Sequence, residues 1–297
     1  MASRSPDADA SGTTQRPAAR DILHAAREVG EDELKRSPVG LGFSALAAGS
    51  TLGLTGLSVA LVLSVTDGVA GAELIAALFY PLGFIAVIVG RQQLFTENTL
   101  FPVILVLEER RHLRATARLW VVVLLANQVG AAFFAFIAAK TSALPEDVQA
   151  RLVELGEHAA APGASELFWS GLVGGWIIAL MAWMVTGAQW TIAQVVIIWI
   201  MTLPLGLGEF AHSVAGAGEI LTAAWDGALG PGDYFSWLWA AVLGNVVGGV
   251  VLVTLLNYAQ VVGSGRDRER SNLSVDEAHA DMRRERPARN PFGRRSS

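Results

Sequence analysis

Long apolar blocks separated by short polar loops dominate the middle of the chain. Six blocks are long enough to cross the roughly 30 Å hydrocarbon core of a bilayer, and they run over 41–65, 73–107, 115–139, 166–187, 191–218 and 235–262. The pattern predicts an all-α integral membrane protein with a polar tail (1–37), a six-span domain (38–263) and an Arg-rich tail (264–297). Within the first tail, the run from Asp21 to Lys35 favours a short surface helix.

The fifth block is interrupted by polar residues. It holds Glu209, His212 and three glycines within residues 206–216. Glycines at this density weaken a helix, and a buried acid and imidazole are costly in hydrocarbon. Irregular backbone at membrane depth is tolerated where it lines a cavity. We therefore predict a broken span that lines a transport path.

The second block is interrupted over residues 91–99. Thr96 or Asn98 is expected to cap a new half-helix there, with Pro102 in or near its first turn. That half-helix would aim its free N–H groups and positive dipole end at the centre of the protein, as would a half-helix starting near Ser213. Two such ends predict a site for a small anion, with His212 beside it.

The two halves of the membrane domain resemble each other. Residues 127–131 read Asn-Gln-Val-Gly-Ala and residues 245–249 read Asn-Val-Val-Gly-Gly, each in the third span of its half. Because three is an odd number, a second three-span copy enters the membrane from the opposite side, which gives an inverted repeat. Asn127 and Asn245 are interpreted as structural supports that bond the loose backbone of the break each one faces.

Charge is concentrated at the two ends of the chain and in one loop. Of the 22 Lys and Arg, six precede residue 38 and nine follow residue 263, and the loop between the second and third spans is Arg-rich. By the positive-inside rule both termini face the cytoplasm, in a cell inner membrane. The chain has no cysteine, which excludes disulfides and thiolate metal sites. We expect no enzyme activity, cofactor, metal or nucleic-acid partner, and we expect the C-terminal arginines to contact anionic lipid.

Five motifs, in order along the chain, resemble the formate/nitrite transporter family. They are Leu-Phe-Thr at 94–96, Asn-Gln-Val-Gly at 127–130, the span from Gly171 to Met184, Phe-Ala-His-Ser-Val-Ala at 210–215, and Gly-Asn-Val-Val-Gly-Gly at 244–249. The resemblance covers residues 38–262. It implies an aquaporin-like subunit, a homopentamer with one pore per subunit, and passage of small monovalent anions such as formate, nitrite, hydrosulfide, acetate or lactate.

The resemblance also implies which residues line the pore. Thr96 and His212 would face each other at its centre, with apolar constrictions at Phe84 and Leu205. The aromatic residues beside the two central positions, Phe95 and Phe210, are expected at the pore as well. The anion would cross as its neutral acid after taking a proton, which agrees with the much larger cost of desolvating a charge.

The chain departs from the family pattern at several positions, which places it in a divergent branch. The family's span-four asparagine falls at Gly175, and the lysine expected in the preceding loop has no counterpart near 159–161. Around the histidine, the family's glutamate is Ala211 and its asparagine is Gly216. The first break instead carries Glu97, and Arg91 is an added cation.

These departures leave several interpretations open. Glu97 is interpreted either as an ion pair with Arg91 or as a proton-relay or selectivity group. Glu209 could pair with Arg91 or tune His212, whereas His158 reads as a solvated loop residue. Two rival functions remain: the same fold passing a neutral or cationic solute because of Glu97, or a closed-pore membrane scaffold whose tails recruit partners.

Overall fold

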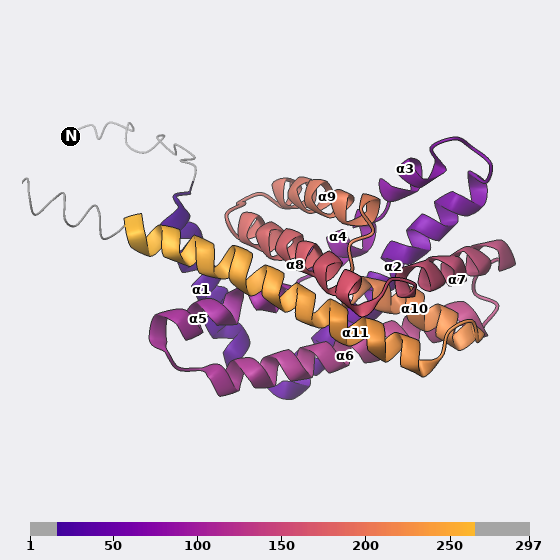
Figure 1. Ribbon diagram of the computed structural model, residues 1–297. Helices are drawn as coiled ribbons and strands as arrows, with labels where there is room; N and C mark the ends of the chain where they lie inside the picture. Colours follow the sequence, from indigo (N-terminus) through magenta and orange to yellow (C-terminus); the bar gives the residue numbers. More distant parts are fainter. Residues whose placement is uncertain (1–16, 265–297) are drawn as a thin grey trace, which may run out of the picture. The chain divides into compact units, whose positions relative to one another are not determined.

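The computed structural model describes residues 17–264, and within this range all regular structure is helical (Figure 1). In chain order the elements are α1 (Ala19–Lys35), α2 (Pro38–Val65), α3 (Ala72–Ala77), α4 (Pro81–Val89), the 3₁₀ turn η1 (Glu97–Thr99), α5 (Phe101–Glu109), α6 (Leu113–Lys140), α7 (Glu146–Ala160), α8 (Ala164–Thr186), α9 (Thr191–Leu207), α10 (Ala215–Asp226), α11 (Pro231–Val247) and the π-helix η2 (Gly248–Leu255). One compact unit extends to Leu256, and a second begins at Asn257. The predicted C-terminal tail lies, except for Ser264, outside the described residues.

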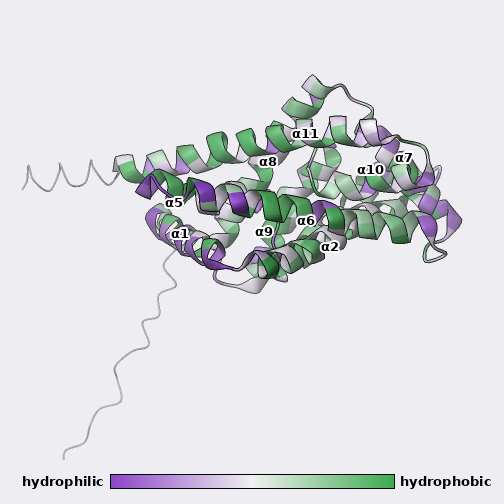
Figure 2. Ribbon diagram, turned by 90° about the horizontal axis from the view of Figure 1, so that it is seen from below, coloured by the Kyte–Doolittle hydropathy of each residue, from purple (hydrophilic) through white to green (hydrophobic). Residues whose placement is uncertain are grey.

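Five helical stretches are long and apolar enough to cross a membrane. They are Pro38–Val65, Ala72–Val89, Leu113–Lys140, Ala164–Thr186 and Pro231–Ser264, and Thr191–Leu207 is a shorter apolar helix. Figure 2 shows α2, α6, α8 and α11 mostly in the green of hydrophobic residues, whereas α1 carries much of the purple. The prediction of an all-helical membrane protein is confirmed for the described part of the chain.

Both predicted interruptions are present. In the second block, α4 ends at Val89 and no α-helix forms again until α5 begins at Phe101; in the fifth, α9 ends at Leu207 and α10 begins at Ala215. Pro102 lies in the first turn of α5, as predicted. The predicted side-chain caps are wrong: η1 and α5 have no side-chain cap hydrogen bond. The Thr96 and Asn98 side chains bond other groups instead.

The predicted surface helix exists as α1, and it packs on the membrane domain. Leu23, Ala26 and Gly30 are buried, and a Cβ placed on Gly30 would lie 2.5 Å from the carbonyl oxygen of Phe101. Arg27 forms ion pairs with Glu108 and Glu109 at the end of α5. The predicted boundary at residue 38 therefore separates helices that pack together.

Glycines allow the long helices to approach closely. On α6, a Cβ at Gly130 would lie 2.2 Å from the carbonyl oxygen of Leu46 in α2. In the second half, Gly244 and Gly248 press against the backbone of α8 in the same way, as the predicted small-residue face requires. These contacts hold α6 against α2, and α11 with η2 against α8.

The helix between α6 and α8 was not among the elements predicted from the sequence. This helix, α7, buries Val148, Leu152 and Gly156, and a Cβ at Gly156 would lie 2.4 Å from the carbonyl oxygen of Glu219 in α10. The α7 helix thus lies against the second half of the broken fifth block. It brings His158 to the functional site described next.

Candidate pore centre and vestibule

The two breaks meet at a contact between Thr96 and His212. Thr96 Oγ1 lies 2.8 Å from His212 Nε2, and both residues are buried, at 0% and 1% exposure. The residues are 116 positions apart in sequence. The structure therefore brings the central polar group of one break directly onto that of the other.

The backbone at the start of α10 fixes the tautomer of His212. The N–H of Ala215 donates to His212 Nδ1 at 3.0 Å, and the N–H of Val214 approaches the same atom at 3.4 Å. Nδ1 is therefore an acceptor without a proton, so the ring proton sits on Nε2 and donates to Thr96 Oγ1. The hydroxyl proton of Thr96 then remains available to a third group. A proton on Nδ1 would face two N–H groups and the positive end of α10.

Apolar side chains enclose this polar contact. Phe84 on α4 is fully buried and presents its ring edge-on to the imidazole of His212, with centroids 5.2 Å apart and an interplanar angle of 77°. Leu205 on α9 is also fully buried and lines the same cavity as His212. The Thr96–His212 pair thus has apolar neighbours from both broken blocks.

The two phenylalanines beside the centre lie differently. The ring of Phe95 points toward Trp120 on α6, with centroids 6.0 Å apart, and no contact of the ring with His212 is present in the described chain. Phe210 lines the cavity, and its ring lies against Gly208, where a Cβ would approach within 2.5 Å. Of the two, Phe210 is the one that lines this cavity.

Asn127 and Asn245 hold the two breaks by matching sets of hydrogen bonds. Asn127 accepts from the N–H of Phe95 at 3.0 Å and donates to the carbonyl oxygens of Ala45 and Gln93 at 2.7 and 2.9 Å. Asn245 makes the same three kinds of contact in the second half. Its Oδ1 accepts from Ser213 N at 2.9 Å, and its Nδ2 donates to Gly171 O and Ala211 O at 2.7 and 2.9 Å.

These bonds show which residues of the two breaks correspond to each other. Phe95 occupies the place that Ser213 has in the other half, so the counterpart of His212 is Leu94 and not Thr96. A serine on α2 and a serine on α8 add one more matching bond: Ser44 accepts from Gln93 N, and Ser170 accepts from Ala211 N. The imidazole therefore has an apolar equivalent, and only one of the two breaks supplies an ionisable group at this position.

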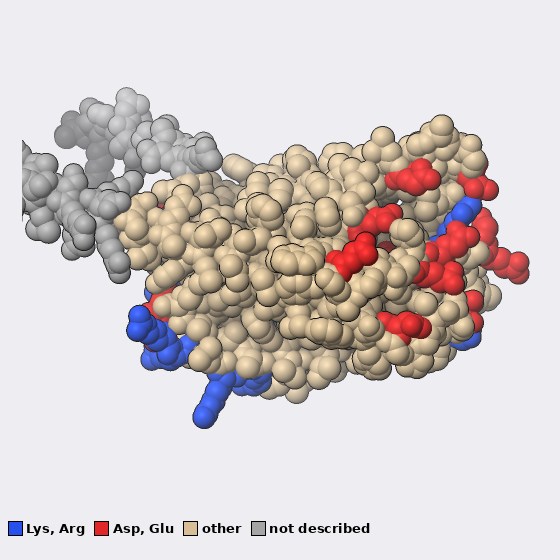
Figure 3. Space-filling view, in the orientation of Figure 1, with Lys and Arg blue, Asp and Glu red and all other residues tan. Residues whose placement is uncertain are grey.

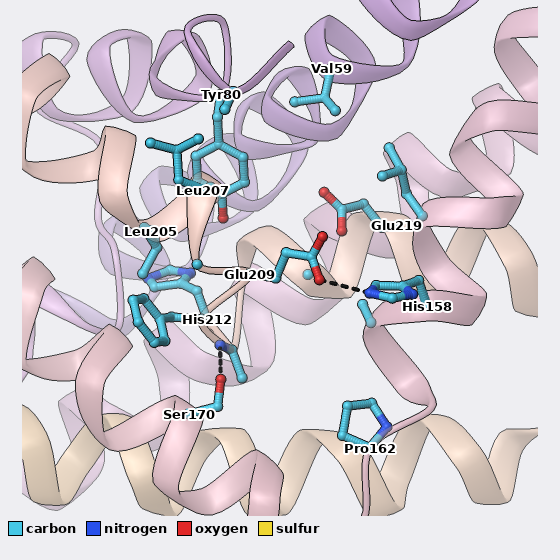
Figure 4. A pocket seen from close by; sticks show the side chains of 18 of the residues that line it. Val59, Tyr80, His158, Pro162, Ser170, Leu205, Leu207, Glu209, His212 and Glu219 are labelled. Carbon is cyan, nitrogen blue, oxygen red and sulfur yellow. Dashed lines mark hydrogen bonds and ion pairs between the residues drawn. The ribbon is translucent and has the colours of Figure 1, made fainter. Parts of the chain in front are cut away.

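A cavity of about 500 Å³ lies beside the centre, and we call it the vestibule. It is lined by α2, α3, α7, α8, α9, the α9–α10 break, α10 and α11, and His212 and Leu205 lie close together in its lining (Figure 4). Glu209 and Glu219 project into it. In Figure 3, acidic side chains gather over the region of α3 and α7, whereas Lys and Arg gather over α1 and α5.

Glu209 does not pair with Arg91. Its carboxylate lies 2.7 Å from Nε2 of His158 on α7, so that interpretation, and that of His158 as merely solvated, are wrong. Glu209 adopts φ 50°, a left-handed conformation that is strained for any residue with a Cβ. The local pattern around neither residue indicates this pair, because the partners lie 51 residues apart.

Arg91 and Glu97 interact only at longer range. Arg91 is exposed and Glu97 is half-buried. The charge of Arg91 acts on Glu97, but no ion pair closer than 4.0 Å joins them in the described structure. The hypothesis of a direct ion pair that fixes the break is therefore wrong.

Comparison with known proteins identifies the family. The family model described as "Formate/nitrite transporter" matches residues 20–259. The chain belongs to the formate/nitrite transporter family. The match begins within α1, in agreement with the packing of that helix on the membrane domain.

Relatives in this transporter family carry several names. The inner membrane protein YfdC of Escherichia coli (strain K12) is 36% identical, covering 79% of this chain and 76% of its own. The probable formate transporter of Methanothermobacter thermautotrophicus is 28% identical over 65% and 79%, and the nitrite transporter NirC of Salmonella typhimurium is 27% identical over 74% and 82%.

Solved structures share the fold. An "FNT family ion channel" matches with a TM-score of 0.68 at 23% identity, covering 82% of this chain and 96% of its own. A structure described as "Pentameric formate channel with formate bound" matches with a TM-score of 0.64 at 18% identity, covering 80% and 99%. At these identities the likeness establishes the formate/nitrite transporter fold.

One departure from the formate/nitrite transporter pattern has a direct packing reason. A Cβ at Gly175 would lie 2.2 Å from the carbonyl oxygen of Asn245. An asparagine cannot occupy this position unless α8 and α11 move apart. The glycine therefore belongs with the close packing that positions Asn245, the support of the second break.

Proposed function

We propose that this protein is a membrane channel or transporter for small monovalent weak-acid anions such as formate and nitrite, or their conjugate acids. The observation that carries the proposal is the buried Thr96–His212 contact beside the vestibule, in a chain of the formate/nitrite transporter family. Phe84 and Leu205 serve as the apolar constrictions beside it. Phe210 faces the solute path, and Phe95 supports the first break from behind.

The proposed architecture has six spans arranged as two inverted three-span repeats. α4, η1 and α5 together make the second span, and α9 and α10 make the fifth. The matched bonds of Asn127 and Asn245 support this arrangement, because two breaks held in the same way are what a structural repeat produces. The segments 1–37 and 264–297 are proposed as cytoplasmic tails of this domain.

The relatives support a proposal for the assembly and the location of this protein. We propose a homopentamer, since the related formate channel is described as pentameric, and an inner membrane location, since the Escherichia coli relative is named for it. The concentration of arginine in the loop between α5 and α6 favours cytoplasmic termini.

Desolvation favours passage of the neutral acid. A charge moved past Phe84 and Leu205 loses its hydration without a permanent countercharge, whereas a neutral acid loses far less. The Nε2 proton of His212 is directed to Thr96, and the hydroxyl proton of Thr96 is free to donate to an oxygen of the solute. The pair thus offers a hydrogen-bond donor at the narrowest point without adding a fixed charge.

Flux measurements in proteoliposomes test the proposal. The full chain should carry formate, nitrite, acetate or hydrosulfide down a gradient, and His212→Phe should abolish flux because the ring proton and its contact to Thr96 disappear. Val129→Ala, on the exposed face of α6, is the matched control and should leave flux unchanged. Absence of flux for all four solutes, at acidic and neutral pH, would overturn the proposal.

Glu97 favours a second candidate, in which the pore passes a neutral or cationic solute. The carboxylate adjoins Thr96 in the first break, and no cation lies within ion-pair distance in the described residues. Under this candidate Glu97→Gly should create or increase anion flux. An unchanged anion flux would remove the reason for it.

A further inference from the structure

The lining of the vestibule is strongly acidic. It contains Glu73 on α3, Glu166 on α8, Glu209 in the break and Glu219 on α10, and no Lys or Arg. The only basic side chains in the lining are His158, which bonds Glu209, and the buried His212. If all four carboxyl groups are ionised and His212 is neutral, the formal charge of the lining is −4 when His158 is neutral and −3 when it is protonated.

Glu219 occupies the most constrained place among these acids. A Cβ at Gly56 on α2 would lie 2.7 Å from its Cγ and 2.9 Å from its Oε1, so the absence of a side chain at Gly56 makes room for this carboxylate. Figure 4 shows the Glu219 carboxyl beside that of Glu209, directed into the cavity. No hydrogen bond or ion pair to its carboxylate is present in the described chain. Its oxygens are therefore available to interact with a solute in the vestibule.

The charges act on a solute before it reaches the constriction. Walls of low dielectric focus the field of carboxylates into a cleft, and potentials of several kT change the local concentration of ions by about tenfold or more. An anion in the vestibule meets carboxylates from four different elements, whereas an uncharged acid does not experience this repulsion. The path to His212 on this side thus disfavours the anion, which is the abundant form of a weak acid at neutral pH.

We propose that the vestibule is a charge filter in which Glu219, together with Glu209, excludes anions, so that a weak acid enters from this side in its uncharged form. The proposal rests on the proposed function. The acid takes its proton from bulk water outside the vestibule, and the carboxylates act by repulsion and not as proton donors. Glu219 and Glu209 are therefore specificity-determining residues.

Cysteine labelling tests the filter without any flux measurement. The chain has no cysteine of its own, so Ala161→Cys places one thiol in the exposed part of the vestibule lining. A cationic (trimethylammonium) and an anionic (sulfonate) methanethiosulfonate each form a disulfide with the thiolate and release methanesulfinate. Both react with the same thiolate, so the ratio of their rates reports the local potential and not the ionisation of the thiol.

We expect the cation-to-anion rate ratio at Ala161→Cys to exceed that of a free thiol in solution by about fivefold or more. Adding Glu219→Gln should lower the ratio, whereas Glu28→Gln, which removes an exposed glutamate of α1 outside the vestibule, should not. Glu73→Gln, at an exposed position, gives a second readout in case Glu219→Gln does not fold. A ratio at or below the solution value would overturn the filter, whether or not the protein transports.

Flux then separates repulsion from proton donation. At about pH 7, where the anion dominates, Glu219→Gln should raise formate flux several-fold, while at about pH 5 the change should be smaller because the uncharged acid is about a hundredfold more abundant. A lower flux in Glu219→Gln at acidic pH would mean that the carboxyl supplies a proton, and would overturn the filter. If the parent protein carries no weak acid at any pH, the proposed function fails, and the labelling ratio alone decides the filter.

Discussion

Single polar side chains in and beside the breaks form hydrogen bonds with partners from distant parts of the sequence. Thr96 is a suitable cap by its type and position, yet its hydroxyl contacts an imidazole from the other half of the chain. Asn127, in contrast, was identified from the sequence as a support, because a polar residue in an apolar helix next to a break has loose backbone to bond. Its exact partners, Ala45, Gln93 and Phe95, required the structure.

We predict that Asn127→Ala destabilises the protein by about 2–4 kcal/mol, because it removes the hydrogen-bond partner of the buried Phe95 N–H and of the Gln93 carbonyl and takes away a second bond to the Ala45 carbonyl of α2. Thermal unfolding in detergent, followed by tryptophan fluorescence, measures the change. Val129→Ala, an exposed position two residues along the same helix, should cost less than about 0.5 kcal/mol. Equal losses for the two variants would show that the asparagine bonds do not support the break.

Helix α1 is an element whose packing is decided by a glycine. The sequence predicted the helix from its run of polar and apolar residues, but the contact of Gly30 with Phe101 is a property of the assembled fold. We predict that Gly30→Ala costs about 1–3 kcal/mol, because the added methyl group forces α1 away from α5. Faster tryptic cleavage within α1 would report the displacement.

The matched control on the next helix is Gly42→Ala. No atom lies within 4 Å of the Cβ position at Gly42, so this variant should be neutral or stabilising by up to about 1 kcal/mol through helix propensity. Cleavage of α1 at the parent rate in both variants would refute the proposed role of the close contact.

The junction of α5 with α6 and α1 should respond to pH through Glu109. Hydrogen bonds from His112 and Arg111 lower its pKa from 4.5 to about 2. A carboxyl group with a lower pKa in the folded state stabilises the fold above its unfolded pKa, and this stabilisation is lost as the pH falls from about 4.5 toward 2. Glu109→Gln should therefore flatten the fall in melting temperature on acidification; an equally steep fall would exclude Glu109 as its cause.

At the scale of the whole molecule, large apolar side chains remain exposed on the chain surface. Phe43, Val129, Trp169, Phe235 and Trp239 are each more than half exposed. Such a surface requires lipid or neighbouring subunits as its surroundings. We predict that native mass spectrometry from detergent gives five chains of 31.4 kDa in one assembly, as the proposed homopentamer requires; a stable monomer as the only species would contradict it.

The sequence by itself determined the membrane class, the long apolar helices and the two breaks, because each depends on the local pattern of apolar, glycine and polar residues. It also determined which polar residues in the breaks demand partners. Only the tertiary structure decided which partner each one takes: His212 meets Thr96, and Glu209 meets His158 on a surface helix instead of Arg91. A buried or half-buried polar group bonds to whichever partner the packing brings within reach. The packing of two distant segments cannot be predicted from the local residue pattern of either segment.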